Sequence, residues 1–436
     1  MVSRMALFGR KKRTRTEPEE VAPEAATPEP EPVRPRTIAE HREFLLGQVR
    51  PLRPFGVGVL EAYGHTLCET IDADLELPTY TSATVAGYGV RLADVTGASA
   101  SSPVVLPVVD TLDSPLYRGA PLTPRTAVRV SAGAPLPDGV DVVVGLADTD
   151  RGADEVAILV EPTLLANLRL AGSDIADGTR LLRSGEVLSV GAIGMLAEAG
   201  LDKVLVRPRP RIVVATVGRD LVAPGNPLTS RAQRYDATTL LLAAAARADG
   251  AQVYPVGALG EERAPLARVL SDQLIRADLI VLAAELSEDG AVPAVLGELG
   301  RFEGVEIAMH PGGRQGFAQI GDDATPVLVV PQGTVAAFVS YHAFVRPLIR
   351  RLAGKEQSDS RMVALPARTR LGSDLGVTEL IPITLSERGA EVCGDPEREL
   401  AFDLARADGL AVIDAHVDAI AANQDVECWV FDPSRR

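Results

Sequence analysis

The chain has 436 residues, of which 46% are apolar and 4% aromatic, and this length predicts roughly two to four domains of a globular protein. Its net charge of −15 argues against nucleic-acid binding by the folded body, since neutralising phosphates requires a basic face. No stretch approaches the roughly 18 consecutive apolar residues of a membrane span, so we expect no integral membrane segment and a cytoplasmic location. The three cysteines and five histidines are scattered without ligand spacing, and they predict no metal site.

The first 36 residues differ in composition from the rest of the chain. A basic cluster at residues 10–15 precedes a run rich in glutamate and proline over residues 17–35. Such a segment has too little apolar surface to offset the entropy of ordering, which predicts a disordered tail. The basic cluster could contact an anionic membrane surface or an acidic partner, but a solubilising tail is the favoured interpretation.

Residues 37–74 and 155–207 are expected to form one discontinuous N-terminal and linker domain. Apolar residues at helical spacing predict a helix that starts at Thr37. A second candidate helix covers residues 56–68.

Between these two halves, residues 75–154 carry short β-like runs punctuated by glycine and proline. The clearest runs lie at residues 104–109, 127–130 and 142–144. This pattern predicts a β-rich insertion domain.

Residues 208–354 consist of alternating strand and helix patterns. Strands are expected at residues 211–216, 252–256, 279–283 and 327–330. Helices are expected at residues 237–248, 264–276 and 335–352, the last with a kink at Pro347. Such alternation predicts a mostly parallel sheet that is covered on both faces.

Residues 355–436 return to short strands, including residues 409–413 and 426–431, which predict a small C-terminal β-barrel or sandwich. Together these segments make the expected fold class multidomain α/β plus β.

A motif in the insertion identifies a family. Residues 128–141 read V-R-V-S-A-G-A-P-L-P-D-G-V-D, which resembles the R-I-M-T-G-A-P-L-P-x-G-A-D run of the molybdopterin molybdenumtransferases, the family that includes the gephyrin E domain. A single motif of this kind is weak evidence, but further family motifs follow in the same order and at similar spacing, and the likeness extends from about residue 37 to residue 432. The chain is therefore identified as a member of that family.

The resemblance implies a homodimer of elongated four-domain subunits. Each subunit would hold a molybdopterin-binding-like α/β domain, a β-rich insertion and a small C-terminal β-barrel. The catalytic cleft would lie between the α/β domain of one subunit and the insertion of the other. The implied reaction is molybdate insertion into adenylylated molybdopterin, assisted by a divalent cation such as magnesium.

Several polar positions of the family are replaced in the first half of the chain. The two carboxylates of the family run F-D-N-S-A-M-D-G-Y-A-V correspond to Thr81 and Ala86, and the threonine before the G-A-P-L-P run corresponds to Ala132. Alanine cannot hold a metal ion or position a nucleophile. Arg169 and Asp174 are retained from a family N-x-R-x-x-G-x-D-I; the arginine could engage phosphate, but a structural ion pair between the two is slightly preferred.

The first strand of the α/β domain ends in a loop that has changed its charge. Gly218 and Asp220 match a family S-T-G-D-E-L, but the first acid of that motif is Arg219, which disfavours a cation and could favour an anion. Asp236 matches a family D-S-N at the start of the next helix, where we expect it to cap the helix.

The loop after the strand at residues 279–283 departs furthest from the family. Residues 282–290 read L-A-A-E-L-S-E-D-G where the family has T-S-G-G-V-S-V-G-D, so that Ser287 is retained and Gly290 replaces the acid. Three carboxylates, Glu285, Glu288 and Asp289, now stand where a pterin phosphate would approach. Like charges in a partly desolvated cleft cost on the order of several kcal/mol.

Two further loops keep their turns and lose polar residues. The family run M-K-P-G-K-P loses both lysines here, and the corresponding candidate ligand residues are His310, Pro311, Gly312 and Arg314. The family run L-P-G-N-P-V-S-A-F loses its asparagine and serine, and Gly333 is the candidate in that turn.

From these replacements we expect a catalytically degenerate family member, a pseudoenzyme that acts as a dimeric binding or scaffold protein with a protein or peptide partner near the dimer cleft. Losing one acid–base group typically costs about 10²–10⁴ in rate. No catalytic residue, metal or cofactor is therefore assigned. The alternative is an active transferase that binds magnesium and molybdopterin and uses Arg219, His310 and Arg314 for anions. A site for a different small ligand is a third interpretation.

Overall fold

The computed structural model describes residues 34–113, 120–355, 362–395 and 400–431. The basic cluster at residues 10–15 lies outside the described residues, as does nearly all of the predicted tail. Residues 36–436 form one compact unit, to which the following description is confined. Among its described helices, none has both the length and the apolar character needed to cross a membrane.

The predicted helix after Thr37 is confirmed as α1, Ile38–Gln48. The Thr37 side chain accepts a hydrogen bond from the backbone N–H of Glu40, and the Glu40 carboxylate accepts one from the N–H of Thr37, which is a capping box. The buried side chains Ile38, His41 and Leu45 follow the helical spacing, so one face of α1 packs against the core.

The second predicted helix, at residues 56–68, is wrong. Its start is β1, Phe55–Gly58, which pairs antiparallel with β11, Lys203–Val206, and the residues after β1 form turns. Glycine has low helix propensity, and Gly64 adopts the left-handed conformation with φ of +75°. Pairing with β11, which lies far along the chain, therefore outweighs the helical spacing of the apolar residues in this segment.

The same region contains a short antiparallel pair of strands that are distant in sequence, and one helix. β2, Ile71–Asp72, pairs with β10, Arg180–Leu182. Helix α2, Val190–Glu198, begins where the Ser189 hydroxyl accepts the N–H of Ala192 at 3.2 Å. These elements share a core with β1 and β11.

The insertion is a five-stranded sheet in the order β7-β4-β6-β5-β8. Its strands are β4, Gly87–Val90; β5, Val104–Leu112; β6, Ala127–Val130; β7, Val142–Gly145; and β8, Glu155–Ile158. The three predicted strands are confirmed as β5, β6 and β7. The sheet also continues past the predicted domain end at residue 154, because Val156 and Ile158 of β8 are buried in its core.

The α/β region holds a six-stranded sheet in the order β15-β12-β16-β20-β19-β17. The first four strands run parallel, as predicted: β12, Arg211–Val217; β15, Gln252–Leu259; β16, Leu279–Ala283; and β20, Thr325–Val330. The antiparallel edge, which consists of β17, Gly300–Glu306, and β19, Arg314–Ile320, was not predicted from the sequence.

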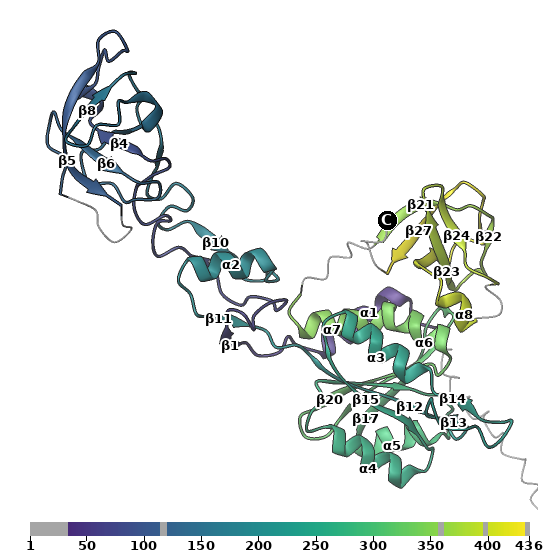
Figure 1. The fold of residues 1–436 in the computed structure, drawn as a ribbon. Helices are drawn as coiled ribbons and strands as arrows, with labels where there is room; N and C mark the ends of the chain where they lie inside the picture. The colour runs from purple at the N-terminus through teal and green to yellow at the C-terminus, as the bar shows by residue number, and fades with distance from the viewer. Residues whose placement is uncertain (1–33, 114–119, 356–361, 396–399, 432–436) are drawn as a thin grey trace, which may run out of the picture. The chain divides into compact units, whose positions relative to one another are not determined.

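Helices cover both faces of this sheet, as the alternation predicts (Figure 1). Helix α3, Thr238–Ala248, and the helical run from residue 334 to 352 pack on one face. Helices α4, Arg263–Gln273, and α5, Ala291–Leu299, pack on the other. Alternate residues of β12 accordingly enter different cores: Ile212 lies on the α3 side and Val213 on the α4 side.

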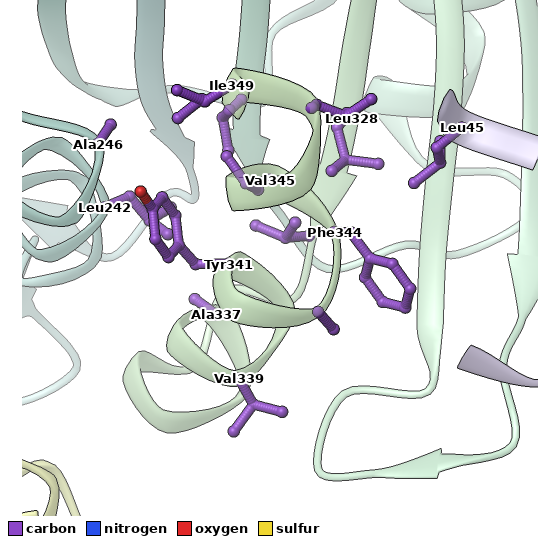
Figure 2. Packing of buried hydrophobic residues seen from close by; sticks show 14 of the residues in the cluster. Leu45, Leu242, Ala246, Leu328, Ala337, Val339, Tyr341, Phe344, Val345 and Ile349 are labelled. Carbon is purple, nitrogen blue, oxygen red and sulfur yellow. The ribbon is translucent and has the colours of Figure 1, made fainter. Parts of the chain in front are cut away.

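The predicted helix at residues 335–352 contains an irregularity just before Pro347. It consists of α6, Thr334–Ser340, a π-helical turn at Tyr341–Val345, and α7, Arg346–Leu352. Because Pro347 has no N–H, the carbonyl of Ala343 lacks its usual partner four residues on. Arg42 of α1 supplies the donor instead, with its Nε 3.0 Å from that oxygen. In Figure 2, Tyr341 of this run lies beside Leu242 of α3, and Val345 and Ile349 lie between α3 and Leu328 of β20.

The C-terminal region is a β domain with its own core, as predicted. Its main sheet has the order β18-β23-β25-β27-β21, with β24 paired to β23. The strands are β18, Met309–His310; β21, Met362–Pro366; β23, Thr378–Ser386; β24, Gly389–Val392; β25, Gly409–Ile413; and β27, Asp425–Val430.

Candidate functional site

A cavity of about 1020 Å³ lies at the carboxyl ends of the parallel strands β12, β16 and β20. We call it the strand-edge cleft. Ligands of open parallel sheets gather at such edges, because the loops that follow the strands surround one hollow. The cleft is lined by Val217, Arg219, Glu261, Glu262, Arg263, Ala284, Glu285, Leu286, Ser287, Asp289, Gly290, Ala291, Val292, Gly312, Gly313, Arg314, Pro331, Gln332, Gly333 and Ala336.

Three helices begin at the cleft wall. Arg263, Ala291 and Thr334 are the first residues of α4, α5 and α6, and the residues before them carry no side-chain cap. Uncapped helix starts leave first-turn N–H groups without an intrahelical partner, and the helix dipole adds partial positive charge there. The backbone of the cleft therefore favours an anion.

The charged side chains of the cleft only partly favour an anion, because carboxylates outnumber arginines among them. It contains three arginines and four carboxylates: Arg219, Arg263 and Arg314, with Glu261, Glu262, Glu285 and Asp289. Arg219 is tied to Glu261 by an ion pair. Neither Arg263 nor Arg314 has an ion pair with another described residue. The carboxylates of Glu285 and Asp289 come from the loop after β16.

The third predicted acid of that loop lies elsewhere. Glu288 lines a neighbouring cavity of about 420 Å³, which shares Leu286, Ser287 and Arg314 with the cleft. The loop after β16 thus separates two hollows, and two of its three carboxylates line the larger one.

The inner end of the cleft is closed by Gln332. Its amide nitrogen donates to the carbonyl of Val217 at 2.6 Å, and its amide oxygen accepts from the guanidinium of Arg234. The Thr238 hydroxyl donates to its backbone carbonyl at 2.8 Å. Only 7% of Gln332 is exposed. Gly218 makes room for the amide, since a Cβ there would lie 2.3 Å from its nitrogen.

Four polar or charged residues of the cleft were not predicted from the sequence: Gln332, Glu261, Glu262 and Arg263. Three of them directly follow β15, at a strand end where polar side chains are expected in such a sheet. That position was a usable signal. The role of Gln332 depends on contacts with loops that are distant in sequence, so no sequence pattern could have indicated it.

Two predicted residues near the cleft have structural partners. Asp220 pairs with Arg234, with its Oδ2 2.7 Å from the arginine Nε. Asp236 is buried and accepts the backbone N–H of Thr239, in the first turn of α3, at 3.0 Å, but the N-cap position itself is Ala237, one residue after the predicted cap. Ser287, Gly290, Gly312, Arg219, Arg314 and Gly333 line the cleft together, as the predicted loop positions require.

His310 and Pro311 do not line the cleft. The His310 Nδ1 lies 2.8 Å from the Glu379 carboxylate, and both residues line a separate cavity of about 510 Å³ in the C-terminal region. Pro311 lines another small pocket with residues of β23. The expected compensation for the lost lysines therefore rests on Arg314 alone within the cleft.

The predicted motif segments of the insertion meet one another. β3, Ser82–Ala83, pairs with β9, Leu168–Arg169, and Ser82 also bridges to Pro135. The Thr81 hydroxyl accepts the N–H of Ala171 at 3.1 Å, so the replacement at residue 81 holds a turn.

The remaining insertion positions also have structural explanations. Arg169 and Asp174 form the expected ion pair, half exposed. Ala86 precedes Gly87, where a Cβ would lie 2.0 Å from the carbonyl oxygen of Val144. Ala132 precedes Gly133, which has a φ of +82°. Close backbone approach and a left-handed turn thus account for the two retained glycines.

The divalent cation that the resemblance implies does not fit the residues present. Across the described ranges, no three or more histidine, cysteine, aspartate or glutamate side chains are placed to hold a metal ion. In addition, the first acid of the loop after β12 is Arg219, whose charge repels a cation. We therefore derive no reaction step through a metal.

Comparisons with known proteins point to one family. Residues 36–200 match the MoeA N-terminal region (domain I and II). The chain is 36% identical over 355 residues to molybdopterin molybdenumtransferase 1 of Mycobacterium tuberculosis, covering 77% of this chain and 82% of that protein. It is 32% identical over 407 residues to molybdopterin molybdenumtransferase 2 of the same organism, covering 90% and 99%.

A solved structure supports the fold. The molybdopterin biosynthesis MoeA protein from Pyrococcus horikosii superposes with a TM-score of 0.80, covering 91% of this chain and 99% of that chain. At 24% identity, this likeness concerns the fold alone.

Proposed function

This chain belongs to the molybdopterin molybdenumtransferase family, and from that premise we propose that it is a catalytically degenerate member, which acts as a homodimeric binding or scaffold protein. Membership in the family connects it to molybdenum cofactor biosynthesis. We propose that the strand-edge cleft of this chain no longer supports the transferase reaction.

The observation that carries the proposal is the loop after β16. It puts Glu285 and Asp289 in the wall of the strand-edge cleft. A phosphorylated pterin would bring its negative charge against both carboxylates, which are exposed at the wall of the cleft and repel an anion that binds there. Arg219 cannot offset them fully because Glu261 already binds it.

The alternative function, an active transferase, has a specific observation in its favour. Arg263 and Arg314 reach the cleft without an ion pair to any described residue, and three helices start at its wall. These groups could hold the phosphates of a nucleotide-linked pterin. The two functions make opposite predictions for turnover.

The deciding experiment measures release of AMP from adenylylated molybdopterin in the presence of molybdate and magnesium. Molybdopterin molybdenumtransferase 1 of Mycobacterium tuberculosis serves as the positive control. We expect no release above the protein-free background. Saturable, metal-dependent release by this chain would establish the active transferase instead.

Neutralising the two cleft acids is expected to strengthen binding of molybdopterin. In the double variant Glu285→Gln/Asp289→Asn, each side chain keeps its shape and loses its charge, so affinity should rise about tenfold. Isothermal titration calorimetry measures the change. Glu298→Gln, an exposed position on α5 outside the cleft, is the matched control and should leave affinity unchanged. Equal affinities for the double variant and the unmodified chain would contradict the repulsion argument.

We also propose that the chain forms a homodimer. Five large apolar side chains are exposed in the small region built around β1, β11 and α2: Phe55, Leu60, Tyr63, Val187 and Val190. Large apolar side chains that are exposed within one small region favour an interaction site there. We expect light scattering after size-exclusion chromatography to give the mass of two chains, and Leu60→Lys/Val190→Lys to give the mass of one. A single-chain mass for the unmodified protein would rule out the dimer.

A further inference from the structure

The inner end of the strand-edge cleft is occupied by a side chain of the protein itself. Gln332 belongs to the turn between β20 and α6, and its amide reaches across to the last carbonyl of β12. Both polar atoms of that amide are used: the nitrogen by Val217 and the oxygen by Arg234. A buried amide with all its partners inside the protein holds one position.

Gly218 and Gln332 fit each other. The glycine leaves a space that the amide nitrogen fills, because an added Cβ would lie 2.3 Å from that nitrogen and 3.1 Å from Leu221 Cδ1. No positive φ requires glycine at this position. Close approach of the Gln332 amide is therefore the reason that glycine suits residue 218.

Arg234 is the charged member of this network. It is held from the other side by Asp220, through the side-chain contact at 2.7 Å and a backbone hydrogen bond at 2.9 Å. The short strands β13, Leu221–Val222, and β14, Arg234–Tyr235, pair at the same place. The Nε of this half-exposed guanidinium thus donates to Asp220, while one of its terminal nitrogens donates to Gln332, which lines the cleft.

We propose that Gln332 is a specificity-determining residue that acts as an internal ligand: it fills the inner end of the cleft and withholds Arg234 from diphosphate anions. This proposal rests on the proposed function, since it explains how the cleft excludes phosphorylated ligands. A planar guanidinium binds phosphate oxygens well when a donor is free. Removing the amide frees both the volume and the donor.

The test measures binding of inorganic pyrophosphate by isothermal titration calorimetry to four forms of the full chain. Against the unmodified protein, Gln332→Ala is expected to bind about tenfold more tightly, because one charge-assisted hydrogen bond becomes available. Gln332→Glu keeps the size of the side chain and adds negative charge, so it should not gain affinity. In Arg234→Met/Gln332→Ala the gain should disappear.

Each outcome decides the matter. Pyrophosphate affinity of Gln332→Ala equal to that of the unmodified chain overturns the proposal, and so does a gain that survives in the double variant. Circular dichroism reports whether each variant is folded; if Gln332→Ala is not, Gln332→Ser replaces it with the same expectation. Tight molybdopterin binding by the unmodified chain would refute the proposed degeneracy, yet the ratio between the pyrophosphate affinities would still test Gln332.

Discussion

Replacing Asp249 with alanine is expected to lower the free energy of unfolding by about 3–5 kcal/mol, because it removes a buried carboxylate that pairs with the buried Arg346. The Arg346 Nε lies 3.2 Å from the Asp249 carboxylate, and the side chains are 11% and 10% exposed. Tyr341 donates its hydroxyl to the same carboxylate at 2.5 Å. These contacts join the end of α3 to the π-helical turn and α7.

Replacing Arg346 as well as Asp249 shows whether the loss of stability comes from the unbalanced charge or from lost packing. In Asp249→Ala/Arg346→Met neither charge is present, and the loss should be much smaller than in Asp249→Ala. Asp249→Asn keeps an acceptor for Tyr341 and should fall between the two. Urea unfolding followed by the fluorescence of Trp429, the chain's one tryptophan, measures all three, since this residue packs against the same core. A cost below about 1 kcal/mol for Asp249→Ala would place the pair among weak surface ion pairs.

The parts of the fold that the sequence predicts are those in which local pattern and long-range packing agree. The strands β12, β16 and β20 are continuous runs of buried apolar residues, and only a sheet covered on both faces accommodates them. Their alternation with helices then requires a parallel arrangement. The family resemblance, carried by motif order, agrees with the same architecture.

The errors lie where distant pairing overrides the local pattern. β17 has the sequence G-R-F-E-G-V-E, with no continuous apolar run, and it becomes a strand because β19 pairs with it along its length. Apolar residues in 56–68 have helical spacing, yet the first residues of this segment form a strand because they pair with β11. In both cases the deciding partner is far away in sequence.

The candidate site follows the same division. Parallel strands end at the same edge of a sheet, and the residues of the loops after β12, β16 and β20 line one cleft. The closure of that cleft was not predictable, because the Gln332 amide bonds a carbonyl 115 positions away. Sequence also cannot distinguish Glu285, which lines the cleft, from Glu288, which lines its neighbour. Such differences depend on side-chain direction within one loop.

Acidification is expected to destabilise the fold through His41, by up to about 3 kcal/mol between pH 6.5 and pH 4. Burial, followed by the positive charge of Arg36, lowers the pKa of His41 from 6.5 to about 4. The ring is fully buried and contacts Phe44 and Phe344, and neither nitrogen has a hydrogen-bond partner among the residues that the structure describes. Above pH 6.5 the histidine is neutral in both states and costs nothing. As the pH falls toward 4, His41 is protonated in the unfolded chain but stays neutral in the native state. Protonation therefore stabilises the unfolded state, and the free energy of unfolding falls.

The slope of stability against pH identifies the residue. Between pH 6 and pH 4.5, the free energy of unfolding should fall by about 1.4 kcal/mol per pH unit more in the unmodified chain than in His41→Leu. His416→Leu removes an exposed histidine and should keep the steeper slope. Urea unfolding at each pH, followed by Trp429 fluorescence, gives these values. Parallel curves for His41→Leu and the unmodified chain would show that another group is responsible.

The position of His41 also specifies where the loss should appear first. α1 packs against the π-helical turn and α7 through Ile38, His41 and Leu45, and protonation would place a charge inside that contact. Charge in an apolar contact is relieved most cheaply by releasing the smaller element. Hydrogen exchange at pH 4.5 should therefore rise in the amides of α1 before those of β16 and β20, and His41→Leu should abolish that order. Simultaneous exchange of all three elements would mean that acid weakens the domain as a whole and that α1 is not released separately.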